Sequence, residues 1–411
     1  MSDSKRYRAY DYLIAGEDYE EFDLAPERDR VPPYEFGLNE SERTRVEDLV
    51  ARSLLISLHD HPVVFPANMA DAPAYNRTGR QRTAYEGLAA SKMTAIFDNM
   101  MDGTGCVTAK APWKFDDIVI DLGMRQADLA HQDEVICATS LGSIYEAKRT
   151  GKVALVFGLE AATPIENELD RLDVLFGLGL RQIGIAYSDG NSLGSGLAEP
   201  NDGGLTNLGR RALHRMAQLG LAVDVSHSSD RTALDVCAAA EAPILMTHAG
   251  ARSVWPTSRM KPDDVLRAIA DTGGVIGMSA APHTTLSHAH PSHTIDSVMD
   301  HFEYIADMVG IDHVAFGPDT LYGDHVGMHT VYAKMLRISS IGGDLEYPRV
   351  PYVAGLENPT ENFVNLTCWL VQHGYSDEEI TKVLGGNIVR ALRAIWHFES
   401  EATGPEQGAQ Q

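Results

Sequence analysis

The sequence predicts an α/β fold, a (β/α)8 barrel of the TIM type with a metal site at the carboxyl ends of its strands. Short apolar runs alternate with segments whose apolar residues recur at helical spacing, which is the pattern of repeated strand–helix units. Several of these runs end in a histidine or a carboxylate. The length of 411 residues and the hydrophobic content of 44% suit such a barrel with insertions.

The composition narrows the classes of partner. Lys and Arg together number 34 against 58 Asp and Glu, which gives a net charge of −24. A charge of this sign repels phosphate backbones and anionic lipids, so we expect neither a nucleic-acid nor a membrane partner. The four cysteines are far apart, and the first residues lack an apolar signal segment. A reduced, cytoplasmic setting is therefore expected.

Three regions differ in character. Residues 1–45 are rich in acidic residues, Tyr and Pro and have little periodicity, so we expect an acidic arm that lies on the surface or contacts another subunit. Residues 46–398 carry the alternating pattern and are expected to form the barrel. Residues 399–411 are polar and contain glycine, which predicts a flexible tail.

The first predicted strand carries two histidines. A helix over residues 41–52 leads into the apolar run 54–58, which ends at His59-Asp60-His61. Because side chains alternate across a strand, His59 and His61 project to one side and Asp60 to the other, as a chelating pair requires. The alternative, two solvent-facing histidines in a loop, is weakened by the purely apolar residues just before them.

The next units bring a carboxylate to a strand end. Residues 92–98 are expected to form a strand and residues 125–152 one long helix, followed by a strand over 153–160 that ends in Glu160. A carboxylate at the rim of an apolar barrel costs several kcal/mol unless a charge or a metal compensates it. We therefore group Glu160 with the histidines.

A helix over residues 169–179 and a strand over 181–187 follow. This strand ends in a phenol, Tyr187, rather than an imidazole. The glycine-rich loop 188–204 is long enough to lie over a pocket.

Two further histidines close the strands of one βαβ unit. Residues 219–227 and 242–248 are predicted strands, separated by a helix over 228–240. A right-handed crossover places the strands roughly 5 Å apart if they are neighbours, with both carboxyl ends at one edge. His227 and His248 could then share a metal, although either one alone is more often a hydrogen-bonded rim residue.

The last units complete the barrel. A helix from residue 261 to 270, a strand over 274–279 and a helix over 295–308 lead to an eighth strand, 313–319, which ends in Asp319.

Two helices, over 357–374 and 377–397, close the chain. Residues 283–293 hold four histidines. We do not expect a metal there, because a loop that follows no strand end lacks the rigidity that fixes ligand geometry.

The polar residues at the strand ends together support one interpretation. In a parallel barrel, polar residues at the carboxyl ends of strands are the catalytic ones. Four histidines and two carboxylates exceed the needs of one tetrahedral zinc, but would serve two metals bridged by a carboxylate. The reaction class is then metal-assisted hydrolysis. The candidate metal ligands are His59, His61, Glu160, His227, His248 and Asp319.

Short motifs along the same segments resemble the renal (membrane) dipeptidase family of metallopeptidases. They lie in the family's order between about residues 54 and 396, at 158–160, 180–181, 204–209, 216–227, 242–248, 262–265, 317–319, 355–357 and 385–387. The resemblance implies a barrel that holds two divalent metals, usually zinc, and a homodimer.

The resemblance also implies residue roles. Glu160 would bridge the metals and Asp319 would also move protons. The sites on either side of the bridge would be completed by His227 and His248 and by His59, His61 and Asp319.

Arg259 falls where the family has the arginine that binds the substrate carboxylate. A guanidinium presents a fork that matches a carboxylate. The alternative is a surface arginine paired with one of the many acids of the chain.

Two positions depart from the family pattern. The family motif in the first strand is His-x-Asp, and His61 stands at its third position, which leaves the metal pair one unit more positive. Tyr187 replaces a substrate-contacting histidine; a phenol can donate a hydrogen bond to an oxyanion but cannot become cationic. Of the properties that the resemblance implies, dipeptide specificity is the one that these two changes affect.

We predict a binuclear metallohydrolase of the dipeptidase type, which cleaves a dipeptide or small amide with a free carboxylate by attack of a metal-bound hydroxide. Asp319, Glu160 and Tyr187 are the expected catalytic residues, and Arg259 with Tyr187 is expected to bind substrate. One alternative is a relative acting on another C–N, ester or C–C bond of a small carboxylated molecule. The other is a non-catalytic ligand-binding barrel, which would have no need of the proton carrier Asp319.

Overall fold

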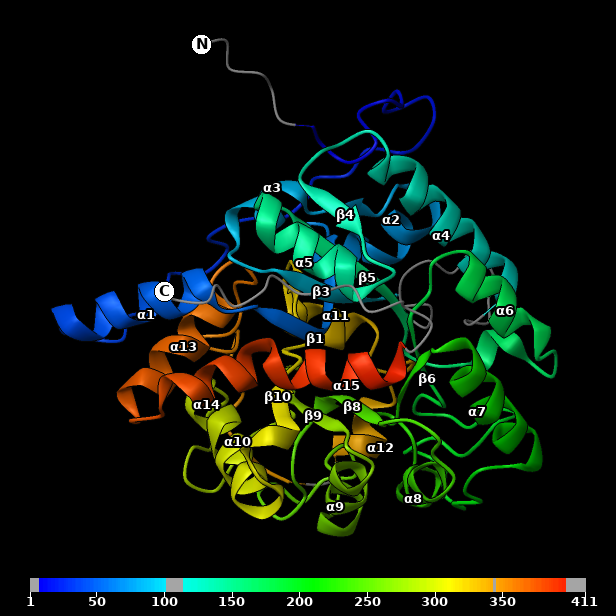
Figure 1. Cartoon of the computed structure of the whole chain (residues 1–411). Coiled ribbons are helices and arrows are strands. Elements are labelled where there is room, and N and C mark those ends of the chain that lie inside the picture. The colour runs from blue at the N-terminus through cyan, green and yellow to red at the C-terminus, as the bar shows by residue number, and fades with distance from the viewer. Residues whose placement is uncertain (1–6, 101–113, 343–344, 397–411) are drawn as a thin grey trace, which may run out of the picture.

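The computed structural model describes residues 7–100, 114–342 and 345–396. In this part of the chain, parallel strands surround a central core, each hydrogen-bonded to the next (Figure 1). In order around the barrel they are β1 (Ile56–Val64), β3 (Ala95–Met100), β5 (Val153–Leu159), β6 (Gln182–Gly184), β7 (Ala222–Asp224), β8 (Leu245–Ala249), β9 (Val275–Met278) and β10 (Val314–Phe316), which β11 (Leu321–Tyr322) continues.

The last strand returns to the first and closes the barrel. β11 pairs in parallel with β1, with His61 opposite Leu321. Just before it, the backbone N–H of Asp319 donates to the carbonyl of His59 at 2.9 Å. Because β10 and β11 belong to one segment, they count as one strand of the barrel, and the described strands occupy eight positions around it. The predicted (β/α)8 architecture is confirmed.

Helices surround the strands (Figure 1). Several begin at side-chain caps, as in α7, where the hydroxyl of Thr206 accepts from the N–H of Gly209. The helices are α1 (Glu40–Arg52), α2 (Ala72–Thr78), α3 (Tyr85–Ala90), α4 (Phe115–Leu129), α5 (Leu141–Thr150), α6 (Asp170–Gly177), α7 (Asn207–Leu219), α8 (Asp230–Ala238), α9 (Asp263–Asp271), α10 (Ile295–Val309), α11 (His325–Val331), α12 (Ile338–Gly342), α13 (Asn362–Gln372), α14 (Asp377–Thr381) and α15 (Asn387–Ile395).

The single long helix predicted over residues 125–152 is wrong. The chain leaves α4 after Leu129, forms a short strand, β4 (Val135–Cys137), beside β5, and re-enters a helix at α5. The amide of Gln132 holds the turn, because it donates to the carbonyls of Leu129 and Val135 and accepts from the N–H of Val135. The continuous apolar run Val135–Cys137 is typical of a strand, whereas one face of a helix has apolar residues three or four positions apart.

The two histidines of the first strand lie within β1, not at its tip as predicted, because β1 continues to Val64. Between Ser57 and Asp60 it contributes one more residue than β3 does over the paired stretch. Leu58 therefore packs in the barrel interior while the next residue, His59, also turns inward. Such a one-residue bulge re-aims side chains next to functional sites.

A second bulge lies in β8, which has one more residue than β9 between Met246 and Ala249. Glycines make room for the displaced carbonyl of Thr247. A Cβ at Gly277 would lie 2.0 Å from this oxygen, and one at Gly317 would lie 2.1 Å from it. The bulge turns Thr247 and His248 to the same side, toward the barrel mouth.

The opposite end of the barrel is closed by α15. Small and branched side chains of the strands, among them Ala95, Ala154, Leu245 and Ala315, form one buried cluster with residues of this helix and with Trp396. In Figure 1, α15 crosses in front of the strands. Over the described residues the barrel interior is thus a packed core, and the site lies at the carboxyl ends of the strands.

The predicted N-terminal arm lies against the barrel over its described residues. The N–H of Tyr10 and the hydroxyl of Tyr7 donate to the carboxylate of Asp128, at 2.7 and 2.5 Å. Leu24 forms a β-bridge with Pro66. Residues 1–6 and the predicted tail, 399–411, lie outside the described residues.

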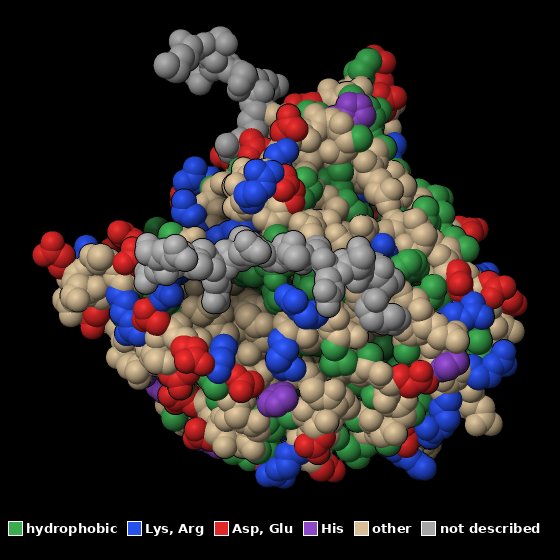
Figure 2. All heavy atoms as spheres, in the orientation of Figure 1, with side chains coloured by type: hydrophobic (Ala, Val, Ile, Leu, Met, Phe, Trp, Pro, Cys, Tyr) green, Lys and Arg blue, Asp and Glu red, His purple; other side chains and the backbone are tan. Residues whose placement is uncertain are grey.

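Acidic and basic side chains are interspersed on the face of the molecule seen in Figure 2. Within the described segments, no helix is both long enough and apolar enough to cross a bilayer.

A buried ion cluster joins β3 to α4. The guanidinium of Arg125 donates to Asp98 at 2.7 Å and to Asp121 at 2.9 Å, and all three side chains are buried. We predict that Arg125→Met lowers the free energy of unfolding by about 3–5 kcal/mol, because it leaves uncompensated buried carboxylates. Chemical denaturation measures this loss. The matched control is Arg149→Met, whose partner Glu146 is exposed; an equal loss there would contradict the argument.

Candidate metal centre

The six predicted ligands converge at the carboxyl end of the barrel. β1, β8 and the turn between β10 and β11 contribute three histidines and a carboxylate. Glu160 directly follows β5, and His227 lies three residues after the end of β7. All six side chains are buried: His59, His61, Glu160, His227, His248 and Asp319.

Their ligand atoms face one another across a few ångströms. Nε2 of His61 lies 3.0 Å from Oδ1 of Asp319 and 3.6 Å from Oε1 of Glu160. Nε2 of His227 lies 3.5 Å from the other oxygen of Glu160 and 2.9 Å from Nε2 of His248. Glu160 thus presents one oxygen to each half of the cluster.

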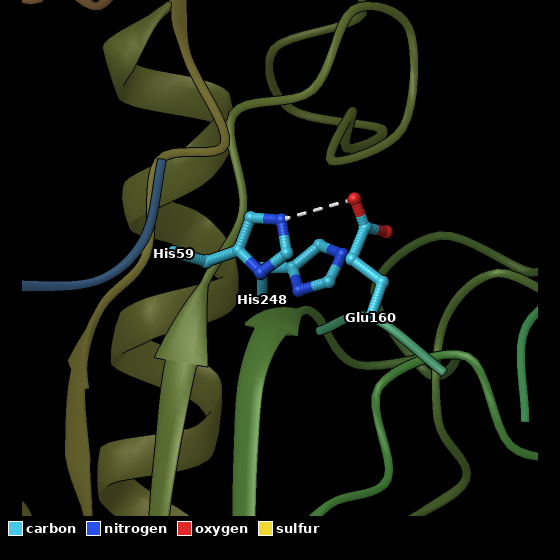
Figure 3. A group of neighbouring side chains, drawn as sticks. All are labelled: His59, Glu160 and His248. Atoms are coloured by element: carbon cyan, nitrogen blue, oxygen red, sulfur yellow. Dashed lines mark ion pairs between the residues drawn. The ribbon is translucent and has the colours of Figure 1, made fainter. Parts of the chain in front are cut away.

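Figure 3 shows how His59, His248 and Glu160 lie. Nε2 of His59 is 3.8 Å from Oε1 of Glu160, and the rings of His59 and His248 are 3.5 Å apart between centroids. Two triads have ligand atoms within 4.8 Å of one another: His59, Glu160 and His248, and His59, His61 and Asp319.

The donor set fits a divalent metal. Nε2 of His59 is fully buried and has no hydrogen-bond partner among the described residues. A buried polar atom without a partner is rare and calls for an explanation. Imidazoles and carboxylates are the ligands that zinc and related ions prefer, so a cation between these side chains would satisfy that atom.

A second layer of polar groups orients the rings. Nδ1 of His61 lies 2.7 Å from the carbonyl of Asn99. The hydroxyl of Thr247 lies 3.3 Å from Nδ1 of His59 and 2.9 Å from Nδ1 of His248. With their Nδ1 atoms engaged, these rings turn Nε2 toward the centre, as in metal sites whose ligands are held from behind.

Asp224 anchors this layer. Its Oδ1 accepts from the N–H of Thr247 at 2.9 Å and from the hydroxyl of Ser226 at 2.6 Å. Sequence reasoning passed over Asp224 and Thr247. The usable signal was a carboxylate inside the apolar run 219–227.

The electrostatics of the cluster are set by burial and by one ion pair. Burial opposes protonation of His61, but the hydrogen bond and charge of Asp319 outweigh it and raise the pKa of His61 to about 9. Burial would raise the pKa of Asp319, yet the hydrogen bond from His61 holds it well below its usual range. Burial raises the pKa of Glu160 to about 8.

The other three imidazoles stay neutral. Burial holds the pKa values of His59, His227 and His248 well below the ordinary value of 6.5. Neutral imidazole is the form that binds a metal.

Asp319 occupies a strained backbone position with a φ of 62°. A non-glycine residue in this left-handed region costs about 1–3 kcal/mol and persists only where its surroundings fix it. Here the carboxylate of Asp60 accepts from the N–H of Thr320 at 2.7 Å and from its hydroxyl at 2.8 Å. Asp60, the outward residue between the two histidines, thus holds the turn that presents Asp319.

The two predicted substrate-binding residues line the mouth of the centre. The ring of Tyr187 stacks on that of His227, with centroids 4.0 Å apart. Arg259 is buried, and it donates to the carbonyls of His248 at 2.8 Å and Ser226 at 3.4 Å. Arg259 is therefore not a surface arginine. Both residues border the same cavity as Glu160 and Asp319.

Two histidines of α11 also border this cavity, and sequence reasoning missed them. His325 and His329 lie one helical turn apart, with ring centroids separated by 4.7 Å. They follow no barrel strand, so the strand-end pattern could not reveal them. Their spacing of four residues on a helix was the available signal.

The histidine-rich loop 283–293 brings no metal ligands together among the described residues. Nδ1 of His293 accepts instead from the N–H of His283 at 2.8 Å, and Nδ1 of His290 lies 2.7 Å from Asp300. These histidines serve the structure of the loop.

Comparison with known proteins decides the family. The sequence pattern of the membrane dipeptidase family (peptidase family M19) matches residues 119–333, just over half of the chain. The chain belongs to the membrane dipeptidase family. The resemblance inferred from the motifs is confirmed.

Curated relatives are dipeptidases of this kind. Dipeptidase tcpJ of Claviceps purpurea is 27% identical over 278 residues, or 67% of this chain and 59% of the relative. Dipeptidase verJ of Clonostachys rogersoniana is 28% identical over 281 residues, or 66% of this chain and 64% of the relative. The chain thus spans about three-fifths of the length of these relatives.

Solved structures share the fold. An amidohydrolase from Pseudomonas aeruginosa superposes with a TM-score of 0.71 at 23% identity, covering 86% of this chain and 99% of its own. A metallopeptidase from Rhodobacter sphaeroides, liganded with a phosphinate mimic of the dipeptide L-Ala-D-Ala, has a TM-score of 0.63 at 20% identity, with coverages of 84% and 100%. The barrel is therefore common to this protein and these structures.

The protonation states predict how metal affinity depends on pH. Without metal, His61 (pKa about 9) and Glu160 (pKa about 8) hold protons at pH 7. Because a ligand must lose its proton to bind, we expect affinity for a divalent ion to rise from pH 7 to pH 9, by up to about tenfold per pH unit for each proton released.

Competition with a chromophoric chelator across this pH range measures the affinity. His61→Gln should bind metal more weakly and show a shallower slope, because one titrating ligand is gone. A wild-type affinity that does not change between pH 7 and pH 9 would contradict the assigned protonation states.

Proposed function

We propose that this protein is a metal-dependent hydrolase of the dipeptidase type, which cleaves a dipeptide or small amide that carries a free carboxylate. The observation that carries the proposal is the convergence of four imidazoles and two carboxylates at the barrel mouth, with Arg259 bordering the same cavity. Family membership and the dipeptidase relatives support the choice of bond.

The donor set supports two divalent ions, one on each side of Glu160, and zinc suits imidazole and carboxylate ligands. His59, His61 and Asp319 would hold one ion, and His227 with His248 the other. Ions bound there would activate water and polarise the scissile carbonyl. The expectations of a homodimer and a cytoplasmic location also remain proposals, resting on the family resemblance and on the composition.

The chain's own residues supply positioning and proton transfer. Arg259 presents its guanidinium to the cavity and would hold the carboxylate on the leaving side of the scissile bond. Tyr187, stacked on His227, would donate its hydroxyl proton in a hydrogen bond to the developing oxyanion. Asp319, at the same rim, would accept a proton from the attacking water and return it to the leaving amine.

The first test is turnover of a panel of dipeptides. We expect hydrolysis that is lost on treatment with a chelator and restored by added zinc. Asp319→Asn should lower kcat by about 100-fold or more, the range typical of a general acid–base group. Glu160→Gln should lower both metal content and activity.

Metal analysis of protein purified without chelator accompanies this test, and we expect about two divalent ions per chain, as in bridged two-metal sites. Full activity of Glu160→Gln in protein that holds no metal would refute the mechanism. Tight binding of a dipeptide without any turnover would favour the ligand-binding alternative.

The second test concerns the carboxylate clamp. Amidating the C-terminus of the best substrate should lower kcat/KM, with an increase of about 2–4 kcal/mol in the activation free energy, because a buried guanidinium loses a charged partner. Arg259→Lys should recover little, since an ammonium cannot form the two-pronged contact. Free and amidated substrates are compared on wild type and Arg259→Ala; an equal penalty on both substrates would show that Arg259 is not the clamp.

A further inference from the structure

A larger cavity adjoins the metal centre. Its volume of about 600 Å³ lies within the range of small-molecule sites. It shares several wall residues with the cavity at the metal centre, among them Arg259, Thr284 and His329. The outer cavity is therefore adjacent to the place where we propose that the substrate reacts.

The described lining of the outer cavity is basic, whereas the chain as a whole is acidic. The protein carries a net charge of −24, yet the described residues that line the cavity include no Asp or Glu. The charged residues of this described lining are Arg259 and Arg349. His283 and His329 add hydrogen-bonding capacity without charge, since burial lowers the pKa of each to about 4.

Arg349 is held in place at the cavity wall. Its guanidinium lies over the ring of Tyr347, 4.5 Å from the ring centroid. Tyr347 in turn packs against Trp255 and His283, with ring centroids 5.9 and 5.7 Å away. The N–H of Val350 donates to Nε2 of His283 at 3.2 Å, which fixes the backbone beside the arginine.

Arg349 is exposed, and its guanidinium forms no ion pair with a carboxylate among the described residues. A pre-positioned cation that no described carboxylate neutralises favours an anionic partner, because little side-chain freedom is lost when the partner binds. Arg259, deeper in the same cavity, is the proposed site of the substrate's terminal carboxylate. The group next to that carboxylate is the side chain of the leaving residue.

We propose that the outer cavity binds a second anionic group of the substrate at Arg349, so that the preferred substrates are dipeptides whose leaving residue is acidic, Asp or Glu. This inference rests on the proposed function and specifies its substrate class. A terminal carboxylate at Arg259 and a side-chain carboxylate at Arg349 would together orient the leaving residue.

The experiment compares kcat/KM for Ala-Glu, Ala-Gln and Ala-Lys on the metal-loaded enzyme. Glutamate and glutamine have nearly the same shape, so their difference isolates the charge. We expect wild type to prefer Ala-Glu over Ala-Gln by about two- to fivefold, the range for an exposed charge pair. Ala-Lys should be the poorest of the three.

Two charge reversals separate the local contact from the overall charge. Arg349→Glu should abolish or reverse the ratio of kcat/KM for Ala-Glu to that for Ala-Gln. The control is Arg267→Glu, which makes the same change of charge at an exposed position of α9 outside both cavities. It should keep the wild-type preference.

Equal cleavage of Ala-Glu and Ala-Gln by wild type would overturn the inference and leave the proposed function standing. So would an equal loss of preference in both charge-reversal variants. If no dipeptide is cleaved, the proposed function fails, and calorimetric binding of glutarate against pentanoate decides the inference. Tighter binding of glutarate that disappears in Arg349→Glu supports the site, and equal binding of the two acids rejects it.

Discussion

The burial of six ionisable side chains at one end of an apolar barrel is the constraint on which the rest of this structure depends. Each buried charge costs several kcal/mol unless a partner compensates it. The protein meets this cost in part with the pair of His61 and Asp319, 3.0 Å apart, and with three imidazoles that stay neutral. The burial cost that these interactions do not compensate falls on the imidazole nitrogens and carboxylate oxygens that face one another at the centre of the cluster.

Backbone irregularities let the strands meet this constraint. A regular strand alternates its side chains, so it cannot turn two successive residues into the barrel. The bulges in β1 and β8 do so, and each lets an apolar or hydroxyl side chain and a histidine share the interior. Space for the second bulge depends on Gly277 and Gly317, whose missing side chains admit the carbonyl of Thr247.

The features of this structure that depend on periodic patterns can be predicted from the sequence, and the others cannot. The barrel, its strand order and the residues that meet at its mouth follow from apolar runs with polar ends. The strand β4 was hidden because a turn held by the side chain of Gln132 leaves no mark in the apolar spacing. The bulges come from pairing between strands, and the outer cavity joins Thr257, His283 and Arg349, so neither is visible in any local pattern.

The position of α15 has a consequence for how the chain reaches its native state. Its residues 387–395 and Trp396 complete the barrel interior, yet they are synthesised after all eight strands. In a nascent chain that has been synthesised only as far as the strands and the helices between them, the end of the barrel opposite the metal centre would be open. Its apolar residues would then be exposed to water. Such a species resembles the aggregation-prone intermediates of large domains, so we expect docking of α15 to be the step that removes this apolar surface from water.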